Sequence, residues 1–236
     1  FADADEVLAF RPDEVYGVPA VDERAVYFQE RWDAAQAAYP NQIYTGGYHK
    51  TVFSACIAAF GWDLFLTAGG MDPQGFDAVL EGFYRISEAN FRAWAKTTAP
   101  VFICHDDIVW TSGPVFRPEW YRQYVFPRYE RLWDILKSAG KKVLFCSDGD
   151  FTPFVHCGTL FMKLDFTKID VSKVPPGQVG PCSVPAMNYA VMFLYNKDTY
   201  KDNPPHGWAD FFDVEKFPGT RGIQDYADPE GYMVEL

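Results

Sequence analysis

The chain has 236 residues, of which 48% are hydrophobic and 18% aromatic. This length and composition are enough for one large domain or two small ones, and they exclude an intrinsically disordered chain. The net charge of −11 excludes a protein whose main partner is a nucleic acid, because such proteins need clustered lysine and arginine.

Membrane and secretion signals are not found in the sequence. No run approaches the 18 or so uncharged apolar residues of a membrane helix, so we expect no membrane span. No basic segment followed by an apolar one indicates secretion. Five cysteines are scattered without a CxxC pair: Cys56, Cys104, Cys146, Cys157 and Cys182. Reduced thiols in a cytoplasmic protein are the simplest interpretation, and a single disulfide stays open.

Helix and strand patterns alternate over the first 148 residues. Apolar spacing predicts four helices, over residues 20–40, 51–66, 72–100 and 117–142. Short apolar runs predict three strands between them, over residues 42–49, 101–106 and 142–148. Gly61 is expected to interrupt the second helix and Pro127 to kink or divide the fourth. Such alternation predicts an α/β fold with a parallel sheet or barrel.

The pattern changes after about residue 156. The segment becomes rich in proline and glycine, with one apolar run over 186–198 that predicts a strand and a short helix over 204–219. A turn is expected at 228–231. We therefore divide the chain into two predicted domains, residues 1–155 and 156–236.

Polar side chains follow all three predicted strands of the first domain. They are His49, His105 to Asp107, and Cys146 with Asp148. In parallel α/β folds the chemistry collects at the carboxyl ends of the strands. We predict His105, Asp106 and Asp107 as a catalytic group for proton transfer or metal binding. The alternative is that an aspartate caps the next turn while His105 contacts a loop.

Two further residues of this group are metal candidates. Cys146 and Asp148 offer a thiolate and a carboxylate, which both bind zinc. The alternative is a buried thiol beside a turn-forming aspartate.

Three residues near the strand ends are predicted to bind substrate. His49 follows two glycines, where backbone can approach a ligand, although a lone histidine often makes an ordinary polar contact. Trp110 could line a pocket or belong to the core. Arg117 could hold a substrate carboxylate or pair with Glu119 on the surface.

Residues 1–155 resemble the uroporphyrinogen decarboxylase superfamily, in particular its methyltransferase branch. The resemblance is carried by "YTGGYHKTVFSACIAAFGWDLFL" and by the long block from "VFICHDDIVW" to "VLFCSDGD". It implies a (β/α)8 barrel that acts on a tetrapyrrole, or that moves a methyl group from a corrinoid to a small acceptor. Thiol-methylating members hold zinc with a His-x-Cys-Gly-Asn element. Here Cys146 stands at the histidine position and Asp148 at the cysteine position, and the third ligand has no match.

Residues from about 158 to 236 resemble extracellular solute-binding proteins of the spermidine/putrescine type, which feed transporters. The resemblance is carried by "VPAMNYAVMFLYNKDTYKDNPPHGWADFFDVEKFPG" and "RGIQDYADPE". It implies a fragment of a periplasmic-binding-protein-like lobe. Asn188, Tyr189 and Trp208 could then be part of an amine-binding cleft, with an aromatic face for a cation.

Together these observations predict a chimera: a partial TIM barrel followed by the solute-binding fragment, with the apolar run at 187–195 pairing to the open barrel edge. The first functional hypothesis is a decarboxylase-like or methyltransferase-like enzyme with zinc, and with a corrinoid protein as partner and methyl donor. The alternatives are a non-catalytic chimeric fold and a polyamine-type solute-binding protein. A small-molecule substrate is expected in either functional case, and open strand edges predict a homodimer.

Overall fold

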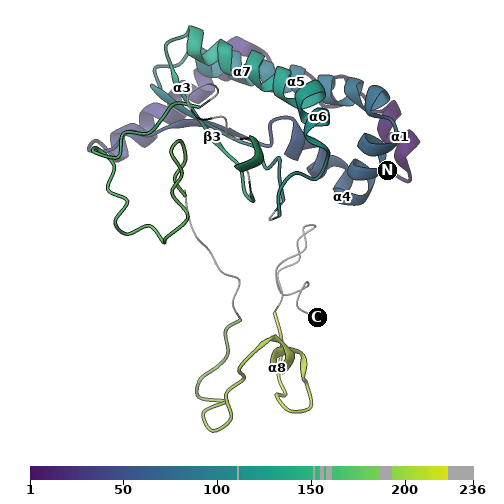
Figure 1. Cartoon of the computed structure of the whole chain (residues 1–236), viewed down its shortest axis with the longest axis vertical. Helices are drawn as coiled ribbons and strands as arrows, with labels where there is room; N and C mark the ends of the chain where they lie inside the picture. The colour runs from purple at the N-terminus through teal and green to yellow at the C-terminus, as the bar shows by residue number, and fades with distance from the viewer. Residues whose placement is uncertain (111, 151, 155–156, 158–160, 186–192, 223–236) are drawn as a thin grey trace. The chain divides into compact units, whose positions relative to one another are not determined.

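The computed structural model describes residues 1–110, 112–150, 152–154, 157, 161–185 and 193–222. The chain divides into two compact units, Phe1–Asp165 and Phe166–Leu236. Figure 1 shows the first unit in purple to green and the second in green to yellow. The domain boundary at residues 155 and 156 stays a prediction.

The first unit is built around one small parallel sheet. Its strands are β1 (Gly46–His49), β2 (Val101–His105) and β3 (Lys142–Cys146), in the order β1-β2-β3. The expectation of a (β/α)8 barrel is wrong, because the described residues form only this three-stranded open sheet. Strand–helix alternation favours parallel pairing of neighbours, but closure needs eight strands of matched tilt and stagger.

Three long helices lie along the sheet. α5 (Pro73–Ala95) packs between α3 (Val21–Ala38) and α7 (Phe126–Ser138), and α5 and α7 run across the same side of the sheet in Figure 1. Phe102 and Cys104 of β2 are buried on this side. Strand residues alternate between faces. Leu144 of β3, on the opposite face, is 52% exposed.

Three more helices belong to the N-terminal half, beside strand β1 with its two glycines. The short helices α1 (Ala4–Ala9) and α2 (Pro12–Tyr16) were not predicted from the sequence. The third is the long helix α4 (Phe53–Met71). Gly61 interrupts α4 with φ of +73°, as predicted. In the described residues α4 is the one helix whose length and composition would suit a membrane. The helix is interrupted at Gly61, and it also has buried residues such as Phe53 and Phe65.

The helical segment after β2 is divided as Pro127 predicted. It consists of α6 (Pro118–Trp120), a π-helical turn η1 (Tyr121–Val125) and α7, with a 3-10 turn η2 (Thr152–Phe154) after β3. Proline has no N–H for an intrahelical bond, so the wider turn before Pro127 accommodates the missing donor.

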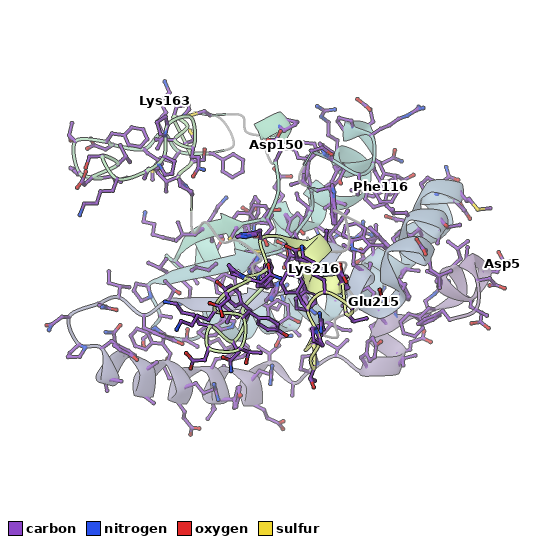
Figure 2. All side chains as sticks on the ribbon, turned by 90° about the horizontal axis from the view of Figure 1, so that it is seen from below. Asp5, Phe116, Asp150, Lys163, Glu215 and Lys216 are labelled. Atoms are coloured by element: carbon purple, nitrogen blue, oxygen red, sulfur yellow. The ribbon has the colours of Figure 1, made fainter. Side chains whose placement is uncertain are left out.

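The described part of the second unit consists mainly of turns around one short helix, α8 (Trp208–Phe212). Helix α8 lies inside the segment 204–219, as predicted. Residues 186–192 of the predicted strand, and with them most of its proposed pairing with a barrel edge, lie outside the described residues. Residues 193–198 form no strand. Side chains of the described residues are drawn in Figure 2, where Lys216 is labelled beside the yellow helix α8.

Candidate functional site

Three chemically active side chains end the three neighbouring strands. The register pairs His49 with His105 and His105 with Cys146. Residues paired in register on parallel strands point to the same face, so these three share the face opposite to Phe102 and Cys104. The sheet thus places three predicted site residues in one row at its carboxyl edge.

Two imidazoles and a carboxylate meet in this row. The rings of His49 and His105 are stacked, with centroids 4.1 Å apart and planes 14° apart. His105 Nε2 lies 3.1 Å from Asp107 Oδ1. One potential ligand atom from each of His49, His105 and Asp107 lies within 4.8 Å of the others. We call these three residues the strand-end triad. His49 is exposed, while the side chains of His105 and Asp107 retain about one third of their exposure.

Asp107 is fixed by hydrogen bonds from two directions. Its backbone N–H donates to Ser54 Oγ at 2.8 Å, and Asp148 N–H donates to Asp107 Oδ1 at 2.9 Å. Ile108 N–H also donates to Ser147 Oγ at 3.1 Å. These bonds tie the loops after β2 and β3 together, so the carboxylate of the triad is held before any ligand arrives.

Burial and charge set the protonation of this row. Desolvation, followed by the charge of the neighbouring His105, lowers the pKa of His49 below 6.5, although Asp107 opposes the shift. Desolvation, then Asp148 and Asp107, raises the pKa of the Cys146 thiol above 9.0. Near neutral pH the row therefore offers a neutral His49 imidazole and a protonated Cys146 thiol.

Asp106 is fully buried and anchors helix α4. Its Oδ2 accepts from Val52 N–H at 2.8 Å and Phe53 N–H at 3.0 Å, and its Oδ1 accepts from Ser54 N–H at 2.7 Å. The Tyr129 hydroxyl also donates to Oδ2. The carboxylate therefore satisfies N–H groups that the first turn of α4 leaves without helical partners. This geometry gives Asp106 a structural role, and a catalytic role for it stays a prediction.

Cys146 and Asp148 are not part of the triad. Cys146 accepts through its backbone oxygen from Asp106 N–H at 3.0 Å, and the Asp148 side chain is exposed. Asp148 contributes to the site through its backbone N–H instead. Zinc binding by this pair stays a prediction.

The residues predicted to bind substrate are spread over several places. The Trp110 ring packs edge-on against Trp62 at 5.3 Å and is 42% exposed. Arg117 is exposed at the start of α6, where it is the neighbouring Arg122 that pairs with Glu119 at 3.2 Å. Tyr189 lies outside the described residues.

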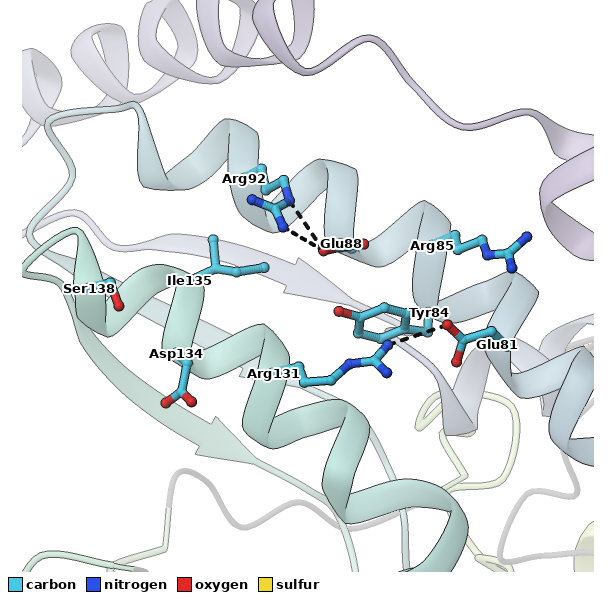
Figure 3. Close-up of a pocket in the computed structure, with 9 residues that line it drawn as sticks. All are labelled: Glu81, Tyr84, Arg85, Glu88, Arg92, Arg131, Asp134, Ile135 and Ser138. Carbon is cyan, nitrogen blue, oxygen red and sulfur yellow. Dashed lines mark hydrogen bonds and ion pairs between the residues drawn. The ribbon is translucent and has the colours of Figure 1, made fainter.

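A charged groove between α5 and α7, shown in Figure 3, was not predicted from the sequence. It has a volume of about 750 Å³. Arg131 lies 3.7 Å above the ring of Tyr84 and 3.3 Å from Glu81, while Arg92 pairs with Glu88 at 2.7 Å. Three arginines face three acidic residues here, so the groove has no net charge to select a charged ligand. Only the tertiary packing of two distant helices creates it.

The second unit contains a hollow of about 280 Å³. Its aromatic residues form a chain of ring contacts, including Phe193 with Phe211 at 5.9 Å and Tyr200 with Phe217 at 5.8 Å. Asp210 lines it and accepts from Lys216 Nζ at 2.9 Å, and this interaction lowers the pKa of Asp210. Its full lining is Phe193, Leu194, Tyr195, Asn196, Thr199, Tyr200, Pro205, Asp210, Phe211, Phe217, Pro218, Gly219, Thr220 and Arg221.

Arg221 holds the wall of this hollow together. Its Nε donates to Phe211 O at 2.8 Å and its Nη1 to Gly219 O at 2.7 Å. Its Nη2 donates to Asp213 O at 3.2 Å and also to Phe217 O. One guanidinium thus links the end of α8 to the loop that follows it. These hydrogen bonds hold the wall of the hollow in place.

Comparison with known proteins finds a family match in the C-terminal part of the chain. Residues 170–236 match the model of the family of bacterial extracellular solute-binding proteins. The chain is also 29% identical over 94 residues to the gamma-aminobutyric acid-binding protein of Pseudomonas aeruginosa. That match covers 39% of this chain and 24% of the relative, so the chain spans about a quarter of that protein's length. No solved structure matches the chain.

Two expectations are corrected by these findings. A cytoplasmic location is wrong, because the matched family consists of extracellular proteins. Cys157 and Cys182 are each disulfide-bonded, so the alternative of a disulfide holds and the fully reduced chain does not; disulfides are typical of oxidising compartments. The comparisons give no support to the resemblance of residues 1–155 to the uroporphyrinogen decarboxylase superfamily, nor to a corrinoid partner. Residues 170–236 are thus similar in sequence to bacterial extracellular solute-binding proteins.

Proposed function

We propose that the chain binds a small solute carrying an amino group, as part of an extracellular solute-binding protein. The observation that carries this proposal is the match of residues 170–236 to that family. The gamma-aminobutyric acid-binding relative supports an amine-bearing solute, because the compound in its name has a primary ammonium group. The resemblance to spermidine/putrescine-type proteins leads to the same ligand class.

The hollow of the second unit has chemistry that suits this ligand. Tyr200, Phe211 and Phe217 offer aromatic faces, which attract a cation. Asp210 offers a carboxylate, whose pKa is lowered by its hydrogen bond with Lys216. An ammonium group that enters the hollow would share Asp210 with Lys216, and its carbon chain would contact the rings.

Calorimetric titration of the purified full chain tests this proposal. The ligands are gamma-aminobutyric acid, putrescine and spermidine, with butyrate as the matched compound without an amine. We expect at least one amine to bind and to stabilise the chain by about 2.7 kcal/mol at about 100 times its Kd. Butyrate should give no heat of binding and no thermal shift.

A matched pair of variants locates the binding. Asp210→Asn removes the charge in the hollow, whereas Asp202→Asn removes an exposed charge of the same unit outside its lining. We expect Asp210→Asn to weaken amine binding at least about tenfold and Asp202→Asn to leave it unchanged. Circular dichroism of both variants without ligand shows whether the fold is kept. Absence of binding for every amine would refute the proposal, and equal binding by both variants would refute the hollow as its site.

A further inference from the structure

We infer that the strand-end triad of His49, His105 and Asp107 is a binding site for a divalent first-row transition-metal ion such as zinc. The site lies in the first unit and does not depend on the proposed solute binding of the second unit. It also differs from the pair Cys146 and Asp148 that the sequence suggested.

The distances fit a shared ion. Ligands of a tetrahedral ion with bonds of about 2.0–2.2 Å lie roughly 3.4 Å apart. His105 Nε2 and Asp107 Oδ1 are already 3.1 Å apart. The donor atom of His49 lies within 4.8 Å of both, so a small movement of this one side chain completes the set.

His49 has the freedom to make that movement. A metal ion lies in the plane of each imidazole that binds it, whereas the rings of His49 and His105 are nearly parallel, at 14°. His49 must therefore rotate out of the stack when an ion binds. Its side chain is exposed at the end of β1, so the rotation displaces solvent rather than core side chains.

The donor types select the ion. Two imidazoles and one carboxylate favour zinc or iron(II), whereas calcium and magnesium prefer sites made entirely of oxygen. Asp107 has the hydrogen-bonded support typical of a metal ligand, from Asp148 N–H and through the bond of its own N–H to Ser54 Oγ. Three protein ligands at a partly exposed edge leave a coordination position open to water, which is the pattern of reactive rather than structural zinc sites.

Metal binding to the full chain tests the inference directly. Protein treated with a chelator and then dialysed against zinc chloride should retain about one equivalent of zinc by elemental analysis. Cobalt(II) chloride should give the visible absorption of a low-symmetry site of nitrogen and oxygen ligands, without a thiolate charge-transfer band. Retention below about a tenth of an equivalent would overturn the inference.

Variants identify the ligands. His49→Ala and Asp107→Asn should each lower zinc affinity at least about tenfold and change the cobalt spectrum, because each removes one of three ligands. His206→Ala is the matched control on an exposed histidine of the second unit and should bind as the unchanged chain does. Cys146→Ser should also bind normally. Unchanged binding in His49→Ala, or loss of binding in Cys146→Ser, would each refute the proposed ligand set. Circular dichroism of His49→Ala confirms that an exposed side chain was removed without unfolding.

Discussion

The imidazole of His49 stacks on that of His105, with ring centroids 4.1 Å apart. The contact follows from the parallel register, which places both residues at the ends of paired strands. The neighbouring His105 disfavours a positive charge on His49, while the Asp107 carboxylate beside them favours it.

A pH titration of the metal-free chain by NMR measures how His105 and Asp107 shift the pKa of His49. We expect His49 to titrate below 6.5. The change His105→Ala should raise the pKa of His49, because it removes a ring that shields His49 from water and a neighbouring charge. Asp107→Asn should move the pKa further down. Because the folded pKa lies below the unfolded value, the folded state binds the proton less well, and stability is lost as pH falls from about 6.5 through the folded pKa. An unchanged pKa in His105→Ala would contradict the stacked arrangement.

Asp106→Ala is expected to destabilise the first unit by at least about 3 kcal/mol, because three N–H groups at the start of α4 lose their acceptor. Tyr129→Phe removes one hydrogen bond to the same carboxylate and should cost about 1.5–3 kcal/mol. Urea denaturation measures both values. Asp148→Ala is the control at an exposed aspartate, and we expect it to change the free energy of unfolding by no more than about 0.5 kcal/mol. A change as small as this in Asp106→Ala would show that the anchor is not needed.

Gly46→Ala should destabilise the sheet by about 1–3 kcal/mol, since a Cβ at this position would lie 2.8 Å from the ring of Trp94. Gly47→Ala is the matched control one residue along the strand. Its nearest neighbour, Ile103 O, would be 3.5 Å away, which is an ordinary contact. We expect the two variants to differ in thermal unfolding, with Gly47→Ala close to the unchanged chain. Equal melting temperatures would mean that Trp94 moves aside without cost.

Lys141 is buried and holds the turn before β3. Its Nζ donates to Thr97 O at 2.6 Å and to Ala99 O at 2.7 Å. Lys141→Met keeps the apolar stem but leaves two carbonyls without this donor, so we expect a loss of about 1–3 kcal/mol in urea denaturation. Lys142→Met, at the exposed neighbour, should change stability by less than about 0.5 kcal/mol. The prediction fails if the two variants denature at the same urea concentration.

Local features of the first unit could be predicted from sequence. Proline and glycine act on the backbone where they stand, so the break of α4 at Gly61 and the division before Pro127 were correct. Apolar runs bounded by such residues also placed β2 and β3 to within two residues at either end. Their parallel pairing follows from the helix that connects them.

Sequence patterns were therefore sufficient for the order of the three strands and of the long helices between them, and for the presence of His49, His105 and Cys146 at the strand ends. The tertiary structure decided how many strands join, and it gave an open sheet of three in the described residues, because closure depends on strand number and stagger rather than on any local pattern. It also separated two adjacent aspartates. Asp106 is buried beneath α4 and Asp107 joins the histidines, because neighbouring residues on an extended chain point in opposite directions.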